Sequence, residues 1–284
     1  PGAGYLELAR AASLSAAAAH ASAGAMLNKV YFLQPLDLTN NANLGVECVI
    51  LDKRFEVRSQ IHGAPPESIA THSAGERALA APQIWQTLRT PALRAQSPTV
   101  VDFREFYDAY HFLGLQYGPS YRMHSGIWAS GSQAAGSLRP RSGKQKVVLH
   151  PADLDAALQL TLIALRASSD ETGGDTKLPF AVEASYLRER SSGWAAVAAQ
   201  SSEALIIRLG EAREAAAVQL DGFKVRALKK DAAVPFVVPR EIVTQRRQIG
   251  PESGNSQPEL NVVSLEAVLD IAQRAAGNAL NADV

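Results

Sequence analysis

The order of helical and strand-like patterns limits the fold of this chain more than any other feature of its sequence. Residues 1–24 have apolar side chains at helical spacing, with Tyr5, Leu8 and Ala12 on one face and Glu7 and Arg10 off it. Three stretches follow in which apolar and polar residues alternate between turns rich in Asn, Asp or Pro, as in antiparallel strands. These stretches are 29–38, 44–61 and 67–80. A helix packed on an antiparallel sheet is therefore predicted.

The same order then occurs a second time. Residues 83–99 have little periodicity and are interpreted as a connector, and residues 100–131 predict a helix, a Gly-Pro turn and a strand. Another helix is predicted to begin at Pro151, and strands are predicted after it, at 178–188, 194–200, 204–210 and 216–228. This pattern fits two similar α+β folds side by side, or one α+β domain, and periodicity does not choose between them.

The helix predicted at Pro151 carries an unusual acid. Proline suits the first helical turn, and Asp153 complements the helix dipole there. Asp155 lies beside the apolar stripe, with Gln159 one turn further along the same face. A carboxylate at a buried edge needs a partner or a function, so Asp155 is either an acid paired with an arginine or a functional group. The stripe consists of Leu154, Ala157, Leu158 and Leu162.

Composition excludes several classes of protein. The 28 basic and 28 acidic residues of the 284-residue chain cancel, which gives no electrostatic basis for binding nucleic acid or an anionic membrane. The single cysteine, Cys48, excludes an internal disulfide and a cysteine-built metal site, and it is interpreted as a small apolar strand residue. No apolar run approaches the ~20 residues that span a bilayer, and no signal peptide is visible. We expect a soluble, cytoplasmic protein without a metal.

The character of the sequence changes after Leu228. Residues 229–263 are rich in Pro, Gln, Ser and charge and predict a linker. Residues 264–284 predict an amphipathic helix with Ser264 as its N-cap.

Four short motifs, in order, resemble the dehydratase domain of modular polyketide synthases. They are "PGAGYLELA", "THSAGE", "GLQYGPSYR" and "LHPADLDAALQL". The chain departs from the usual pattern in "THSAGE", where the family has His-Ala-Ser-Gly, and at Tyr121, where it has Phe. With "LPFAVE" and "GFKVRAL", the resemblance covers about residues 1–228. It implies a double hotdog fold, in which each of two helices is wrapped by a curved antiparallel sheet.

The resemblance also implies how the chain is divided. It suggests an incomplete N-terminal hotdog (1–95), a C-terminal hotdog (96–228), the linker (229–263) and the first helix of an acyl carrier protein (264–284). A docking helix of another kind is the alternative for the last segment. The implied partners are an acyl carrier protein and neighbouring synthase domains, with a homodimer formed through the synthase. The substrate would be carried on phosphopantetheine, and the dehydratase itself would need no cofactor.

The resemblance assigns roles to residues around the fourth motif. In this family a His removes the α-proton of a 3-hydroxyacyl thioester and an Asp protonates the leaving hydroxyl group, which gives a 2-enoyl product. Asp155 corresponds to that acid, and Gln159 to the residue that supports the acid or the substrate hydroxyl. Tyr117, Gly118, Pro119, His150 and Pro151 correspond to supporting or substrate-side positions. The alternative interpretations are a turn for Gly118-Pro119, a support of the second hotdog for Tyr117 and a helix cap for His150.

The catalytic His of the resemblance does not correspond to any histidine in the sequence. The family pattern His-x-x-x-Gly-x-x-x-x-Pro ends at a proline that aligns with Pro1, so the base is expected nine residues before Pro1. His20, His72, His111, His124 and His150 are poor substitutes. We therefore expect a piece of a longer synthase, truncated at both ends and inactive by itself. Besides a dehydratase, the alternatives are a non-catalytic double hotdog scaffold and a product-template or pyran-forming cyclase.

Overall fold

The computed structural model describes residues 2–16, 24–36, 43–78, 95, 99–141, 149–166, 177–188, 193–199 and 204–227. Its helices are α1 (Gly2–Ser15), α3 (Phe103–Phe112), α4 (Pro151–Gln159) and α5 (Thr161–Arg166), with 3₁₀ turns η2 (Pro66–Ser68) and η3 (Pro119–Tyr121). The strands are β1 (Ala25–Phe32), β2 (Leu44–Leu51), β3 (Arg54–Ile61), β4 (Ala70–Ala78), β5 (Thr99–Val100), β6 (His124–Ser130), β7 (Gln133–Leu138), β8 (Lys177–Leu187), β9 (Trp194–Ala199), β10 (Leu205–Gly210) and β11 (Val218–Ala227).

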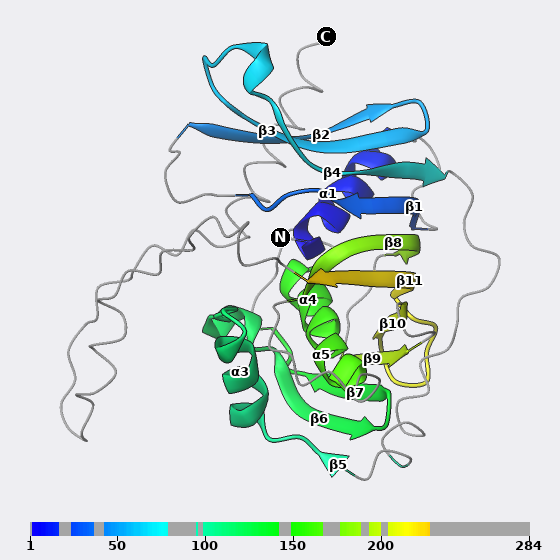
Figure 1. Ribbon diagram of the computed structural model, residues 1–284. Coiled ribbons are helices and arrows are strands. Elements are labelled where there is room, and N and C mark those ends of the chain that lie inside the picture. The colour runs from blue at the N-terminus through cyan, green and yellow to red at the C-terminus, as the bar shows by residue number, and fades with distance from the viewer. Residues whose placement is uncertain are drawn as a thin grey trace.

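All these strands belong to one antiparallel sheet, in the order β2-β3-β4-β1-β8-β11-β10-β9-β7-β6-β5 (Figure 1). The two halves meet where β1 pairs with β8, with Ala25 opposite Leu187 and Tyr31 opposite Ala181. On one half, α1 packs against β1 to β4; on the other, α4 packs against β7, β9 and β10. The two helices also contact each other at the middle of the sheet. This arrangement of two wrapped helices confirms the predicted double hotdog.

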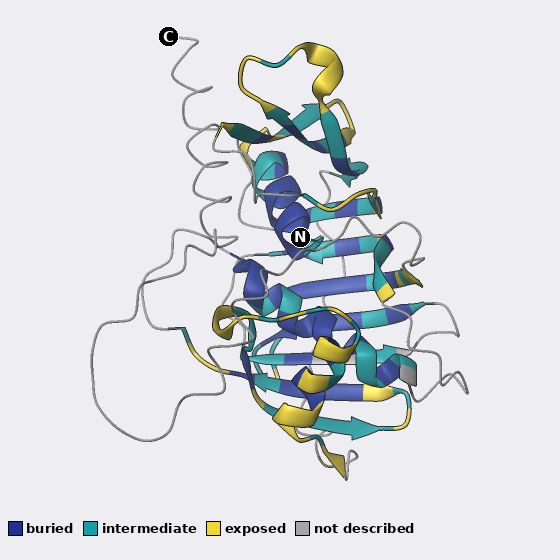
Figure 2. Ribbon diagram, turned by 60° about the vertical axis from the view of Figure 1, so that its left-hand side comes forward, coloured by how far each residue is buried: buried dark blue, intermediate teal, exposed yellow. Residues whose placement is uncertain are grey.

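The core lies between the helices and the inner face of the sheet (Figure 2). In β3 the side chains alternate, so that Phe55 and Val57 point inward with 1% and 0% exposure. Leu6 of α1 and Leu154 of α4 are fully buried on the helical side. Cys48 packs against the same core from β2, as predicted.

Two charged residues of α1 correct a sequence-based expectation. Glu7 and Arg10 lie off the apolar face of the helix, yet they are only 2% and 4% exposed. They form a two-pronged ion pair, with Arg10 Nε 2.5 Å from Glu7 Oε2 and Nη2 2.8 Å from Oε1. The helix is covered on more than one side because the sheet wraps it and α4 contacts it.

Further sequence expectations concern the helix predicted at Pro151 and the predicted domain boundaries. The stripe predicted up to Leu162 is interrupted, because α4 ends at Gln159 and α5 begins at Thr161. The boundary predicted at 95/96, the linker and the C-terminal helix lie in parts of the chain that are almost wholly outside the described residues. Within the described residues, no helix has both the length and the hydropathy to cross a membrane.

A glycine in β7 supports a testable prediction about packing. A Cβ atom on Gly136 would lie 2.6 Å from Nδ1 of the buried His124, so Gly136→Ala should lower the free energy of unfolding by about 1–3 kcal/mol through overpacking. Gly118 is the control, because nothing lies within 4 Å of its added Cβ and its φ is −73°. Urea unfolding of both variants checks this, and equal stabilities would contradict it.

Candidate active site

The site is built on the first turns of α4, which begins at Pro151 as predicted. His150 is the N-cap residue, and its Nδ1 atom accepts a hydrogen bond of 3.1 Å from the backbone N–H of Ala152. This confirms the interpretation of His150 as a helix cap. The cap fixes where the helix starts and therefore where the following acids lie.

The two acids of this helix have different partners. Asp153 pairs with Arg141, whose Nε atom lies 2.9 Å from Oδ1. Within the described residues, no arginine pairs with Asp155, whose Oδ2 atom instead accepts a hydrogen bond of 2.9 Å from Gln159 Nε2. The structure therefore does not support the alternative in which Asp155 is an acid held by an arginine.

Burial lets Asp155 keep its proton at a higher pH than an exposed aspartate does. Burial raises its pKa above the ordinary value, and the Gln159 hydrogen bond acts more weakly in the opposite direction. A carboxyl group with a raised pKa keeps its proton closer to neutral pH. This is the property that a general acid requires.

Gln159 has a partner for each of its polar groups and is only 1% exposed. Its Nε2 atom donates to Asp155 and also, over 3.0 Å, to the backbone carbonyl of Tyr121. Its Oε1 atom accepts from the Tyr107 hydroxyl group at 3.3 Å, and its backbone carbonyl accepts from the Tyr110 hydroxyl group at 2.5 Å. Both the oxygen and the nitrogen of the Gln159 side-chain amide are therefore hydrogen-bonded.

Tyr107 and Tyr110, which both lie on α3, are site residues that no sequence motif predicts. Asp102 caps this helix by accepting from the N–H groups of Arg104 and Glu105, and the buried face carries Phe106, Tyr107 and Tyr110. Two tyrosines three residues apart on a buried face were the available signal, because a buried hydroxyl group needs a partner.

The Tyr-Gly-Pro motif approaches the same place. Gly118 and Pro119 open the turn η3, in which the Tyr121 N–H donates to the Gly118 carbonyl, as the turn interpretation predicts. The Tyr117 ring packs edge-on against Tyr110, with ring centroids 5.1 Å apart. Burial and, after it, the charge of Asp155 raise the pKa of Tyr117.

Three histidines of the described residues are buried, and all three have structural partners. His72 forms a 2.7 Å hydrogen bond with Ser59, and His124 donates from Nε2 to the Ala156 carbonyl. Burial lowers the pKa of His72 and lowers that of His124 to about 4. With His150 capping α4, these contacts agree with the expectation that none of the three is the base.

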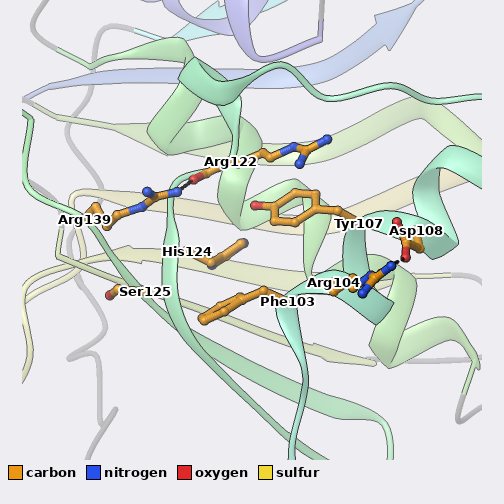
Figure 3. A pocket seen from close by; sticks show the side chains of 8 residues that line it. All are labelled: Phe103, Arg104, Tyr107, Asp108, Arg122, His124, Ser125 and Arg139. Atoms are coloured by element: carbon orange, nitrogen blue, oxygen red, sulfur yellow. Dashed lines mark hydrogen bonds and ion pairs between the residues drawn. The ribbon is translucent and has the colours of Figure 1, made fainter. Parts of the chain in front are cut away.

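A cavity of about 830 Å³ opens between α3 and β6 (Figure 3). Tyr107 belongs to its wall, whereas Asp155 and Gln159 are not among its lining residues. The lining residues are Phe103, Arg104, Tyr107, Asp108, Arg122, His124, Ser125 and Arg139. No group of His, Cys, Asp and Glu side chains in the described part of the chain could hold a metal ion.

Known proteins with similar sequences and structures were compared with the chain. Polyketide synthase ThaG of Burkholderia thailandensis is 32% identical over an alignment of 185 residues that covers 58% of this chain and 3% of that protein. PksN of Bacillus subtilis is 27% identical over an alignment of 192 residues that covers 64% of this chain and again 3% of the relative. The chain thus spans a small part of the curated relatives that it matches.

A solved structure and a family model identify which part it resembles. The crystal structure of a trans-AT polyketide synthase dehydratase domain from Brevibacillus brevis matches with a TM-score of 0.67 and 28% identity, over 81% of this chain and 85% of that one. The model of the polyketide synthase dehydratase N-terminal domain matches residues 86–233, just over half of the 284 residues. The chain therefore belongs to the polyketide synthase dehydratase family.

Proposed function

We propose that this chain is the dehydratase region of a polyketide synthase and removes water from a carrier-bound 3-hydroxyacyl thioester. The observation that carries the proposal is the environment of Asp155: burial raises its pKa, Gln159 orients it, and no arginine of the described residues neutralises it. The family membership and the similar dehydratase domain support the same reaction.

The proposed reaction uses two proton transfers, one from the substrate to a base and one from Asp155 to the leaving hydroxyl group. A base removes the α-proton, and the electron pair of that C–H bond forms the new carbon–carbon double bond. The C–O bond at the β-carbon breaks as Asp155 gives its proton to the leaving hydroxyl group, so that water and a 2-enoyl thioester are released. Asp155 ends as a carboxylate, which the Gln159 N–H group can stabilise.

The base in this proposal is a histidine nine residues before Pro1. One observation supports a position close to Asp155: α1, which begins at Gly2, contacts α4. The family pattern supplies the residue type. A neutral imidazole is a suitable base near pH 7.

The remaining parts of the proposal concern the surroundings of the site. The substrate would arrive on the phosphopantetheine arm of an acyl carrier protein, of which residues 264–284 would be the first helix, and the reaction would take place in the cytoplasm. Neighbouring synthase domains are the other proposed partners, and the synthase would bring two copies together. The two hotdogs would divide near residues 95/96.

A comparison of two chains tests the function. The chain as printed should give no useful dehydration of a 3-hydroxyacyl-pantetheine, and a chain extended upstream through the expected histidine should be faster by about 10²–10⁴-fold, the usual contribution of a general base. Mass spectrometry of the enoyl product provides the measurement. No enoyl product from the extended chain would favour a scaffold, and a cyclised product would favour a cyclase. Fast turnover by the printed chain would show that the base lies within it.

A further inference from the structure

We propose that Tyr107 is a positioning residue: its hydroxyl group holds the Gln159 amide in the orientation in which that amide donates to Asp155. The inference rests on the proposed function, because it concerns the acid of that reaction. It is carried by a continuous chain of hydrogen bonds from Tyr107 through Gln159 to Asp155, with lengths of 3.3 and 2.9 Å.

The direction of these bonds follows from what each group can donate. Burial raises the pKa of Tyr107 to about 12, and a hydrogen bond from the backbone of His124 acts more weakly in the opposite direction. The tyrosine therefore keeps its hydrogen, which it donates to Gln159 Oε1.

This donation selects one of two orientations of the amide. With Oε1 on the Tyr107 side, the Nε2 group faces two acceptors, the Tyr121 carbonyl and the Asp155 carboxyl group. The opposite orientation would place Oε1 against these two oxygens and would leave the Nε2 group facing the hydroxyl hydrogen. Together with the Tyr121 carbonyl, Tyr107 thus favours the orientation in which Asp155 receives a hydrogen bond.

The tyrosine is itself held firmly. Its side chain is buried, its ring packs edge-on against Phe106, and the guanidinium carbon of Arg122 lies 5.1 Å from the ring centroid. Figure 3 shows the ring reaching from α3 into the space between Arg122 and His124. Phenylalanine would keep this packing and remove only the hydroxyl group.

Tyr110 provides a matched control. It lies one turn further along α3, and its hydroxyl group also reaches Gln159, but it bonds to the backbone carbonyl. Tyr110→Phe should therefore lower stability without changing which way the amide points. A difference between the two variants isolates the orienting role from a general loss of packing.

The direct test is an NMR titration of the Asp155 carboxyl carbon in the printed chain, assigned with Asp155→Asn. The Gln159 hydrogen bond lowers the pKa of this group, so Tyr107→Phe should raise the pKa further, whereas Tyr110→Phe should leave it unchanged. In a Gln159→Leu background, Tyr107→Phe should cause no additional change, because the bond through which it acts is already lost. An unchanged pKa in Tyr107→Phe, or equal changes in both tyrosine variants, would overturn the proposal.

Kinetics of the upstream-extended chain add a second readout. Tyr107→Phe should lower kcat by about 2–12-fold, the equivalent of one neutral hydrogen bond, with KM unchanged, and the decline of kcat at high pH should move to higher pH. The titration needs no turnover. If it succeeds while the extended parent chain is inactive, Tyr107 still orients Gln159 and the proposed function alone has failed.

Discussion

Replacing Asp155 with asparagine should leave the fold intact and slow dehydration by about 10²–10⁴-fold in a chain that carries the upstream base. The amide oxygen of asparagine can still accept the hydrogen bond from Gln159 Nε2, so the local structure has little reason to change. Asparagine has no acidic proton for the leaving hydroxyl group. The loss should therefore appear in kcat.

Asp153→Asn is the matched control for this experiment. Asp153 lies on the same helix, but its carboxylate pairs with Arg141, so its replacement should affect stability and leave the chemistry intact. Turnover by both variants is followed through enoyl formation, with circular dichroism as the check on folding. Wild-type turnover in Asp155→Asn would refute the acid role, and equal losses in both variants would point to a general disturbance of α4.

The same substitution has a pH-dependent effect on stability, and its sign is opposite to that of a salt-bridged acid. Because the pKa of Asp155 is raised in the folded state, the folded chain binds this proton more tightly than the unfolded chain. Above the ordinary pKa of an aspartate, the carboxyl group increasingly disfavours folding, up to its folded-state pKa. The stability of Asp155→Asn relative to the parent should therefore rise with pH across that window. Urea unfolding at several pH values measures this.

The parts of the site that could be predicted are those set by local sequence. Pro151 determines where α4 begins, and helical spacing then places Asp155 and Gln159 on one face, where the structure finds them hydrogen-bonded. The contact between Tyr107 and Gln159 joins residues 52 positions apart. It exists because α3 packs beside α4, and no periodicity within either helix encodes that packing.

The fold shows the same division between local and long-range information. Alternation identified most of the strands, but the pairing of β1 with β8 joins distant parts of the chain, as in the hydrogen bond from Ser185 to the Leu27 carbonyl, 158 residues away. The helical pattern puts Glu7 and Arg10 off the apolar face of α1, and by itself such a pattern indicates one buried face. The wrapped sheet and α4 bury the opposite side of α1 as well, and a helical pattern with one apolar face does not predict this burial.

The buried ion pair leads to the largest expected effect on stability. Arg10→Met should lower the free energy of unfolding by about 3–5 kcal/mol, because it leaves the Glu7 carboxylate, 2% exposed, without its guanidinium partner. The double variant Glu7→Leu with Arg10→Met should recover most of that loss, since two apolar side chains of similar size need no compensating charge.

An exposed pair on α3 serves as the control for the Arg10 experiment. Arg104 and Asp108 are 3.7 Å apart, with side chains 90% and 71% exposed, so Arg104→Met should change stability by no more than about 0.5 kcal/mol. Urea unfolding of the three variants supplies the free energies. If Arg10→Met were as mild as Arg104→Met, the Glu7 carboxylate would have to be reached by water or by another cation. If the double variant were no more stable than Arg10→Met, packing of the arginine side chain would be what α1 requires, and the charge pairing would be secondary.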